Sequence, residues 1–288
     1  MLTATRTRPS WLNKKINLKD CSRMKAFLRG LSLHSVCEAA ACPNISECFS
    51  RGIATFMILG GNCTRGCKFC NVEKRLPGEL DNAEPGHVAE AVKRLGLGHV
   101  VITSVTRDDL EDGGAGHFAR TIRSVRMLNN DTSIEVLIPD FKGSIDDIGK
   151  IVFARPVIIG HNVETVPRLY PKIRPQADYK RSLTVLRAVK GLSNGGIFTK
   201  SGIMLGLGEN EEETLEVLRD LRREGCDFLS IGQYLAPGRR YYPVKDYISP
   251  DVFEYYKDKA KELGFKYTAS APYVRSSYRA DEYIKPEN

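Results

Sequence analysis

From about residue 55 onward, short apolar runs rich in β-branched residues alternate with stretches in which apolar residues recur at helical spacing. Val88, Ala91, Val92 and Leu95 illustrate the second pattern, because they fall on one face of a helix. The short runs are apolar almost throughout, which is typical of parallel strands that are covered on both faces. We therefore predict six strand–helix units, whose strands span residues 55–60, 99–104, 133–138, 157–162, 201–207 and 228–233.

The last predicted helix has signals at both ends. Ser249 suits the N-cap and Pro250 the first turn, and Gly264 suits the residue that stops the helix. Val252 and Phe253 begin an apolar stripe at helical spacing between these signals. The pattern predicts a helix that starts at residue 250 and ends just before Gly264.

The alternation predicts an α/β fold with a parallel sheet. Six β/α units of this kind either curl into a partial barrel or form an open, doubly wound sheet. We expect the six units within residues 55–264. Residues 1–54 lack the alternation and form a cysteine-rich N-terminal extension, and residues 265–288 follow the last helix as a C-terminal tail. A chain of 288 residues is long enough for one main domain with these two appendages.

The chain has no apolar run of membrane-spanning length, and its first 20 residues lack the apolar segment of a secretory signal. We therefore expect an intracellular, cytoplasmic protein with no membrane partner. Arg6, Arg8, Lys14 and Lys15 precede the first acidic residue, Asp20, which is a feature of transit peptides. Import into an organelle is the less favoured alternative.

The formal net charge of +8 favours an anionic partner, either an acidic protein or a nucleic acid. No block of five or more basic residues is present, so a generally basic surface without such a partner is the alternative.

Six of the eight cysteines fall between residues 37 and 70, where an even distribution would place about one. A disulfide framework is disfavoured in a chain without a secretory signal, which leaves metal binding or redox chemistry.

Cys63, Cys67 and Cys70 form the pattern Cys-x3-Cys-x2-Cys directly after the first predicted strand. Structural zinc normally takes four protein ligands, whereas this loop supplies three thiolates and no nearby histidine. Three thiolates suit a 4Fe–4S cluster with one iron left open. A zinc site or a loop of buried thiols is the alternative. Active sites of α/β sheets and barrels lie at this end of the strands.

This cysteine spacing, with the aromatic Phe69 before the third cysteine, resembles the signature of the radical S-adenosylmethionine (SAM) superfamily. The resemblance implies a partial (β/α)6 barrel of the radical SAM type. It also implies that the open iron binds the amino and carboxylate groups of SAM, and that an electron from the cluster cleaves SAM to a 5′-deoxyadenosyl radical.

Cys37, Cys42 and Cys48, earlier in the chain, form another triplet, Cys-x4-Cys-x5-Cys, again without an obvious fourth partner. In chain order this is the first triplet, and Cys63, Cys67 and Cys70 are the second. A second, labile cluster follows from this composition. Because Pro43 and Asn44 also suit an ordinary loop, packing or zinc binding remains the alternative.

The two triplets and the segment YVRSSYRA together resemble the lipoyl synthases, over residues 11–280. Further stretches that carry the resemblance are ITSVTRDDLEDGGAGHF, HNVETVPRLY, SGIMLGLGE and QYLAPGRRYYPV. The resemblance implies two 4Fe–4S clusters, with Ser277 as fourth ligand of an auxiliary cluster on the first triplet. A serine oxygen is a hard, weak ligand for iron, so that corner of the cluster can be released.

The resemblance also implies the reaction and the partners. Sulfur from the auxiliary cluster would be inserted at C6 and C8 of octanoyl-lysine on a lipoyl carrier domain or a glycine-cleavage H protein. Such carriers are typically acidic, which a basic enzyme complements. A low-potential electron donor and a cluster-repair protein are implied as further partners. We do not expect a nucleic-acid partner.

Three positions depart from the pattern of the lipoyl synthases. Tyr241 and Arg279 stand where the family usually has histidine, and Ala271 stands where it has glycine. None of these positions is a proposed ligand, so only details of substrate contact are in doubt.

Polar residues at the carboxyl ends of the strands are candidates for SAM contacts, namely Ser104, Asn162, Glu164 and Arg174. In related enzymes residues at such positions contact the amine, the ribose hydroxyls and the carboxylate of SAM. For each of these residues, the alternative is a purely structural role, as a strand-end cap or in a surface ion pair.

Three other features have less bearing on the site. The segment from Arg107 to Asp109 either orders the site or caps the next helix. We predict that the turn from Gly206 to Glu209 is a tight βα turn, since it lacks the full dinucleotide fingerprint. Cys21 and Cys226 are isolated and are excluded as ligands.

Two rival functions remain. Another radical SAM enzyme with an auxiliary cluster, such as a methylthiotransferase acting on tRNA, would also use a basic surface, but no added RNA-binding module is visible. A non-enzymatic iron–sulfur or zinc module would use the cysteines and not the polar strand ends.

Overall fold

The computed structural model describes residues 4–5, 8–14 and 18–284. Its centre is an eight-stranded sheet with the strand order β10-β8-β7-β6-β5-β4-β3-β2. Neighbouring strands from β3 to β10 pair parallel, and β2 pairs antiparallel with β3. The strands are β2 (His34–Ser35), β3 (Phe56–Ile58), β4 (His99–Ser104), β5 (Ser133–Leu137), β6 (Ile158–Gly160), β7 (Phe198–Leu205), β8 (Phe228–Gln233) and β10 (Tyr267–Ser270). A separate antiparallel pair consists of β1 (Ala4–Thr5) and β9 (Tyr247–Ile248).

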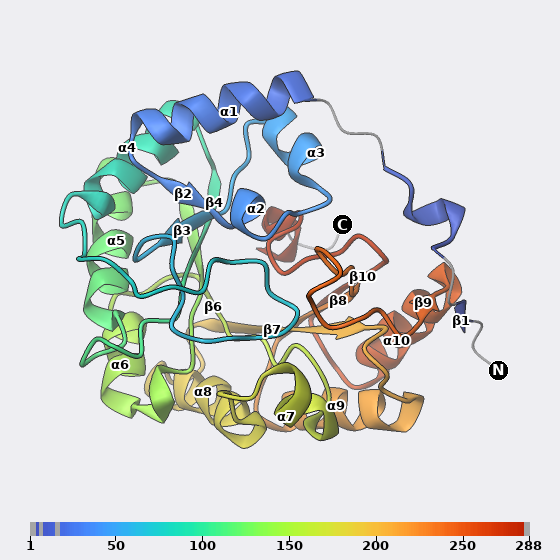
Figure 1. The fold of residues 1–288 in the computed structure, drawn as a ribbon. Helices are drawn as coiled ribbons and strands as arrows, with labels where there is room; N and C mark the ends of the chain where they lie inside the picture. The colour runs from blue at the N-terminus through green and yellow to red at the C-terminus, as the bar shows by residue number, and fades with distance from the viewer. Residues whose placement is uncertain (1–3, 6–7, 15–17, 285–288) are drawn as a thin grey trace.

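The strand order decides between the two predicted architectures. From β3 to β8 the strands follow one another in space as they do in sequence, so every crossover passes in the same direction. Because β-to-β crossovers are right-handed, the connecting helices then collect on one face and the sheet curls. A doubly wound sheet requires a reversal of strand order, and this series has none. The fold is therefore a partial barrel, as Figure 1 shows.

Helices cover the outer face of the curved sheet (Figure 1). Local signals set their ends: Asn210 and Glu213 form a capping box at the start of α9, and Gly96 adopts a left-handed conformation with φ +62° at the end of α4. The covering helices are α4 (Glu84–Leu95), α5 (Ala115–Leu128), α6 (Ile145–Phe153), α8 (Tyr179–Leu192), α9 (Glu211–Arg223) and α10 (Pro250–Glu262). The short α7 (Tyr170–Ile173) and the 3-10 turns η2 (Phe141–Gly143) and η3 (Pro167–Leu169) lie in the connections.

The N-terminal extension is helical, which the strand–helix alternation does not predict. It contains the turn η1 (Ser10–Leu12), then α1 (Leu18–Gly30), α2 (Val36–Ala39) and α3 (Ile45–Ser50). Figure 1 shows these helices beside the C-terminal segment at one end of the barrel. Arg6 and Lys15 of the transit-peptide-like segment lie outside the described residues. None of the described helices combines the length and apolar character that a membrane span requires.

The predicted six strands are all present, and two of them, β4 and β8, have the predicted bounds. Strand β7 begins at Phe198, earlier than predicted. The predicted C-terminal tail starts with β10, a strand that the sequence analysis misses because four residues carry too little pattern. Ser249 is the N-cap of α10, although its side chain makes no capping hydrogen bond, and Gly264 has φ +88°. The division of the chain into three parts stays a prediction.

The C-terminal segment also closes the far end of the barrel. The turn η4 (Ala280–Ile284) places Tyr283 against Phe228 at the start of β8. Its ring lies 3.6 Å from the Nζ of the buried Lys200, which donates a hydrogen bond of 2.9 Å to Glu135. The same segment therefore contributes both to the packing at this end and, through residues 274–278, to the cavity at the other.

Candidate active site

A cavity of about 570 Å³ lies at the carboxyl ends of the parallel strands. Its walls come from strand ends, from the N-terminal extension and from residues 274–278. All twelve residues that the sequence analysis proposes as ligands or cofactor contacts line it: Cys37, Cys42, Cys48, Cys63, Cys67, Phe69, Cys70, Ser104, Asn162, Glu164, Arg174 and Ser277. Tertiary structure thus brings together the two triplets and the strand-end polar groups.

The loop that carries Cys63, Cys67 and Cys70 is anchored at several points. Cys63 N donates to the carbonyl of Glu73, and Lys68 N to the carbonyl of Ile173, both at 2.8 Å. The Cys63 sulfur accepts the backbone N–H of Thr106 at 3.4 Å. These bonds attach the loop to segments that follow three different strands, so the three thiols have defined positions without a bound metal.

Arg65, between the first two cysteines of this loop, is buried and makes two ion pairs. It donates to both carboxylate oxygens of Asp108, at 2.7 and 2.9 Å, and to both of Asp140, at 2.9 and 2.7 Å. Although burial raises the pKa of Asp140, the hydrogen bonds and charge of Arg65 lower it to about 2. The loop is therefore fastened to the ends of β4 and β5 by charge as well as by backbone bonds.

The first triplet lies on α2, the following turn and α3. The C-terminal segment binds directly to this region: Asn44 Nδ2 donates to the carbonyl of Tyr273 at 2.7 Å, and the Tyr278 hydroxyl donates to Glu47 at 2.7 Å. Lys14 joins Asn44 and Glu47 from the other side, at 2.7 Å to each. These contacts bring Ser277 to the cavity that the first triplet lines.

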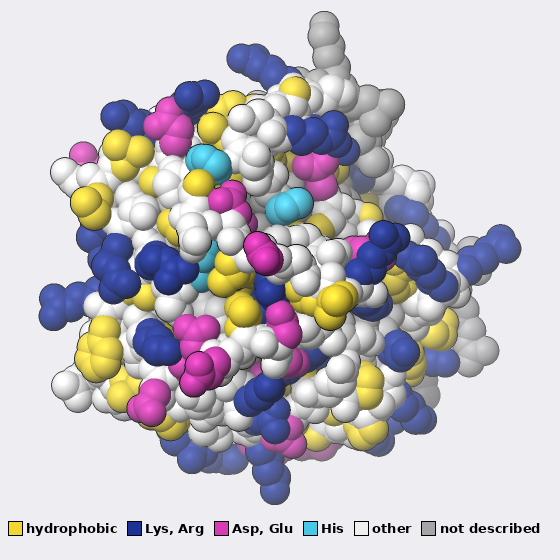
Figure 2. Space-filling model, turned by 60° about the vertical axis from the view of Figure 1, so that its left-hand side comes forward, with side chains coloured by type: hydrophobic (Ala, Val, Ile, Leu, Met, Phe, Trp, Pro, Cys, Tyr) yellow, Lys and Arg dark blue, Asp and Glu magenta, His cyan; other side chains and the backbone are white. Residues whose placement is uncertain are grey.

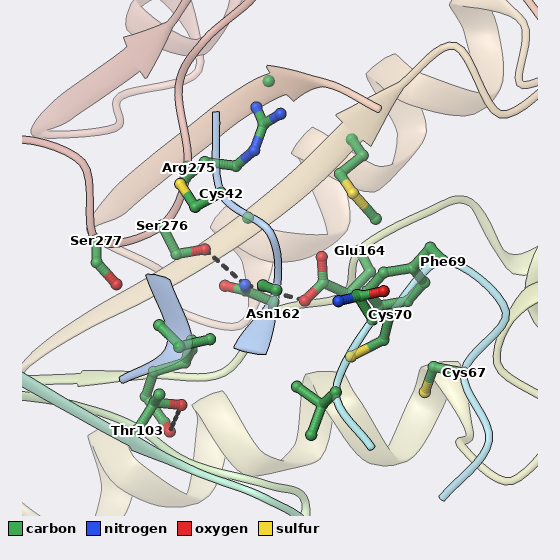
Figure 3. Close-up of a pocket in the computed structure, with 18 of the residues that line it drawn as sticks. Cys42, Cys67, Phe69, Cys70, Thr103, Asn162, Glu164, Arg275, Ser276 and Ser277 are labelled. Atoms are coloured by element: carbon green, nitrogen blue, oxygen red, sulfur yellow. Dashed lines mark hydrogen bonds between the residues drawn. The ribbon is translucent and has the colours of Figure 1, made fainter. Parts of the chain in front are cut away.

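The strand-end polar residues form one connected group. Arg174 Nη1 donates to the carbonyls of Asn162 and Val163, at 3.1 and 3.0 Å. Asn162 Nδ2 donates to Glu164 at 3.0 Å and to Ser276 at 2.6 Å. Figure 3 shows Asn162 and Glu164 between Ser276 on one side and Cys70 and Phe69 on the other. Burial raises the pKa of Glu164, against the opposing charge of Arg174.

Residues 57–221 match the model of the radical SAM superfamily. The lipoyl synthase of Caldicellulosiruptor saccharolyticus is 56% identical, over 96% of this chain and 98% of its own length. That of Geobacter metallireducens is 55% identical, over 96% and 97%. The chain belongs to the lipoyl synthase family. This family lies within the radical SAM superfamily.

Solved structures of more distant proteins share the fold of this lipoyl synthase family member. The structure of methylornithine synthase (PylB) aligns with a TM-score of 0.57 at 16% identity, over 77% of this chain and 72% of that one. The FeFe-hydrogenase maturase HydG from Carboxydothermus hydrogenoformans aligns with a TM-score of 0.56 at 16% identity, over 92% and 77%. The partial barrel of the radical SAM type is thereby confirmed.

Membership of the lipoyl synthase family implies a 4Fe–4S cluster and SAM, and the donors in the cavity fit both. All eight cysteines are free thiols, six of them at the cavity. Burial raises the pKa of Cys37 and of Cys70 to about 12, so iron has to displace their protons when it binds. Among the described residues, no three His, Cys, Asp or Glu side chains converge on a single ion position. A 4Fe–4S cluster does not require this, because each thiolate binds a different iron.

Several polar atoms in the cavity wall are buried without a hydrogen-bond partner. They are Ser104 Oγ, Asn162 Oδ1, Arg174 Nε and His161 Nε2. Such atoms are costly unless a ligand or water satisfies them. These are donor and acceptor atoms of the kinds that the amine, carboxylate and hydroxyl groups of SAM can pair with.

Sequence reasoning missed several residues of the site. Arg65 and Asp140 have no local signature as a pair. His161 lines the cavity, and burial, with the charge of Arg174 adding to it, lowers its pKa to about 4, so its ring is neutral near pH 7. Arg275 and Ser276 also line the cavity. They belong to the YVRSSYRA segment, and this motif is the sequence feature that could have identified them as site residues.

The segment from Arg107 to Asp109 lies beside the cavity and makes two sets of ion pairs. Asp108 binds Arg65, whereas Arg107 pairs with Asp109 and donates to the carbonyl of Leu59 at 3.2 Å, so this segment braces the loops beside the cavity. The prediction that it could cap the next helix is wrong, because Asp112 accepts the N–H groups of Gly114 and Gly116 there.

The segment from Gly206 to Glu209 is a tight βα turn, as predicted, in which the Glu209 carboxylate accepts the N–H groups of Gly206 and Leu207. Cys21 and Cys226 are buried outside the cavity wall. Of the three departures from the family pattern, Tyr241 donates its hydroxyl hydrogen to Asn71.

Proposed function

We propose that this protein inserts two sulfur atoms, at C6 and C8 of an octanoyl-lysine side chain on a carrier protein, and so produces the lipoyl group. The observation that carries the proposal is that two separate cysteine triplets and Ser277 line one cavity, in a chain of the lipoyl synthase family. Bound there, SAM and the cluster of the second triplet supply one-electron chemistry at unactivated carbons, and an auxiliary cluster on the first triplet supplies sulfur.

The residues of the chain bind and orient in this scheme. Cys63, Cys67 and Cys70 hold one cluster, and Cys37, Cys42 and Cys48 hold the other. Ser104, Asn162, Glu164 and Arg174 are the SAM contacts, which the unpaired atoms Ser104 Oγ, Asn162 Oδ1 and Arg174 Nε support. Phe69 lines the same part of the cavity.

Ser277 is the fourth protein ligand of the auxiliary cluster in this proposal. Its hydroxyl oxygen would bind iron more weakly than a thiolate does, so Ser277 would leave that iron as the most easily released corner of the cluster. Apolar side chains from the strand ends, among them Leu137, Ile138 and Ile203, line the cavity and suit an octanoyl chain. They also exclude water from the reacting carbons.

The proposed carrier is an acidic lipoyl domain or glycine-cleavage H protein, and a group of exposed cations supports it. The Tyr241 hydroxyl bonds to Asn71, which joins the loop after β8 to the loop after Cys70. Lys74 and Arg240 both stand over the Tyr241 ring, at 5.4 and 5.1 Å from its centroid. Lys245 lies 5.7 Å from the ring of Tyr242.

We define the basic rim as five exposed cations, Lys68 before Cys70 and Lys74, Arg239, Arg240 and Lys245 in these two loops. Arg75 is also exposed but pairs with Glu73. It adjoins Ala236 and Pro237, which line the cavity. Figure 2 shows that Lys and Arg side chains also occupy much of the periphery of one face. Like charges that the fold holds together attract an acidic partner and speed its association. A low-potential electron donor and a cluster-repair protein complete the proposed partners.

The variant Ser277→Ala tests the proposal, with Ser193→Ala on the outer surface as control. Anaerobically prepared parent protein should hold about eight iron atoms per chain, as two clusters require. Ser277→Ala should lose up to about four of them and form little lipoyl product, but still cleave SAM under reducing conditions. If its iron content and its product yield equal those of the control, the assignment of Ser277 is wrong. About one zinc atom per chain, without SAM cleavage, would contradict the proposal that the protein is a radical SAM enzyme.

A further inference from the structure

A short chain of hydrogen bonds crosses the cavity from Ser276, the neighbour of Ser277, to Glu164. The amide nitrogen of Asn162 donates one hydrogen to Ser276 Oγ at 2.6 Å and the other to Glu164 Oε1 at 3.0 Å. Figure 3 shows this chain running from Ser276, on the side of Cys42, to Glu164, on the side of Cys67 and Cys70. One side-chain amide thus contacts both halves of the site.

The members of the chain are held in place by their surroundings. A Cβ at Gly202 would lie 3.0 Å from Asn162 Oδ1 and 3.1 Å from Ser276 Oγ, so the wall leaves no spare room. Glu164 has a left-handed backbone, with φ +67°, which is strained for a residue with a side chain. Two backbone bonds of 2.9 Å to β7, from Glu164 N to Gly202 O and from Met204 N to Glu164 O, fix it there.

We propose that Ser276 is a positioning residue for Ser277, and that Asn162 couples SAM binding on the Glu164 side to the coordination of the auxiliary cluster by Ser277. This inference rests on the proposed function for the roles of Glu164 and Ser277. Ser276 precedes Ser277 directly, so a bond that holds the hydroxyl of one also limits the backbone positions of the other.

The sign of the coupling follows from the amide of Asn162. Its Oδ1 is buried and has no partner. A donor group of SAM at this oxygen polarises the amide and strengthens the bonds that Nδ2 donates, because linked hydrogen bonds reinforce one another. SAM therefore holds Ser276, and with it Ser277, more firmly. Since linkage is reciprocal, coordination by Ser277 raises the affinity for SAM by the same factor.

The coupling is measured as a cycle of SAM dissociation constants under oxidising, anaerobic conditions that prevent turnover. The variants are Ser277→Ala, Ser276→Ala and the double variant. Ser277→Ala should weaken SAM binding about fivefold in the parent background, and by no more than measurement error in the Ser276→Ala background. Ser230→Ala changes a serine of the same wall that bonds to the Ser201 carbonyl and not to Ser276, Asn162 or Glu164. It should leave the fivefold effect of Ser277→Ala on SAM binding intact.

A second readout does not depend on affinity. In the reduced parent protein, a SAM analogue that is not cleaved should change the electron paramagnetic resonance signal of the auxiliary cluster. In Ser276→Ala this change should be absent while the iron content stays near that of the parent, which a merely structural role would not produce. Should Ser276→Ala fail to fold, Asn162→Leu tests the same bond, because a leucine of similar shape neither donates to Ser276 nor accepts from it.

The inference is overturned if Ser277→Ala weakens SAM binding equally in both backgrounds, or if the parent shows no coupling. It fails alone when Ser277→Ala loses auxiliary iron but the cycle shows no interaction. It fails together with the proposed function when Ser277→Ala retains full iron and product formation.

Discussion

Arg65 and Asp140, 75 positions apart in the sequence, form a buried ion pair with two parallel hydrogen bonds of 2.9 and 2.7 Å. Their side chains are only 7% and 1% exposed. The pair attaches the loop of the second cysteine triplet to the end of β5. Paired, planar bonds of this kind give strong geometric definition, so the spacing of the three thiols depends on it.

Removing the charge of Asp140 should therefore weaken both the fold and the cluster site. We expect Asp140→Asn to lower the free energy of unfolding by about 3 kcal/mol, because Arg65 then keeps a buried charge that Asp108 alone compensates. Urea denaturation of the apoprotein measures this, and iron analysis should show poorer loading of the cluster. Asp258→Asn, on the exposed face of α10, is the control. Equal stability of the two variants would contradict the role of the pair.

The same pair predicts a dependence on pH. Arg65 holds the pKa of Asp140 at about 2 despite its burial, whereas in the unfolded chain an aspartate titrates near about 4. The contribution of Asp140 to stability is therefore complete above the unfolded value and is lost as the pH falls through 4 toward 2. The difference in free energy of unfolding between the parent apoprotein and the Asp140→Asn apoprotein should shrink over that range. A difference that stays constant from pH 6 to pH 3 would exclude the ionised carboxylate as its cause.

Lys200 and Glu135 form the corresponding pair at the far end of the barrel, away from the cavity. Lys200→Met leaves the buried Glu135 carboxylate with only His99 Nε2 beside it, at 3.5 Å, and should cost about 3 kcal/mol of stability. Adding Glu135→Leu should recover most of this loss, since replacing both partners by apolar residues is often neutral. Urea denaturation of the two variants measures the difference. An unrecovered loss in the double variant would show that packing against Tyr283, rather than charge, is decisive.

Gly232 is the point where β8 and the C-terminal segment come closest. A Cβ there would lie 2.1 Å from the carbonyl oxygen of Val274, which is backbone and can move only with residues 274–277. We expect Gly232→Ala to cost about 1–3 kcal/mol and to reduce auxiliary iron, because it displaces Ser277. Gly191→Ala, in α8 with open space around it, should instead stabilise by about 0.5–1 kcal/mol. Full auxiliary iron in Gly232→Ala would show that the segment adapts.

The basic rim predicts carrier binding that depends on salt. Replacing Lys74, Arg239 and Arg240 by glutamine should weaken binding of an octanoylated acidic carrier about tenfold at low ionic strength, and far less at high salt. The control has the same net charge, with Lys93, Arg123 and Lys261 on the outer helices changed to glutamine. Titration of both variants with carrier at two salt concentrations is the measurement. If the two variants bind the carrier equally well at low salt, the carrier does not bind at the basic rim.

Local patterns were enough to predict most of the secondary structure and both cysteine triplets. Strand β4 could be read from its sequence because a buried parallel strand is a continuous apolar run, and α10 because a cap, a proline and a glycine mark its ends. The triplet from Cys63 to Cys70 was recognisable because short covalent spacing places three thiols on one loop whatever the rest of the fold does. Strand β10 is too short for such a signal, and its place beside β8 is a matter of packing.

The amino-acid sequence by itself therefore determined the β/α units, the two sets of three thiols and, through motif resemblance, the expected chemistry. The strand–helix alternation left a barrel and an open sheet undecided, although the motif resemblance implied the barrel. The tertiary structure decided between them, because the curl depends on the spatial order of six strands. It also decided that Arg65 meets Asp140 and that Ser276 meets Asn162, 114 positions away. Contacts between distant segments result from the packing of several elements at once, and no local stretch of sequence contains them.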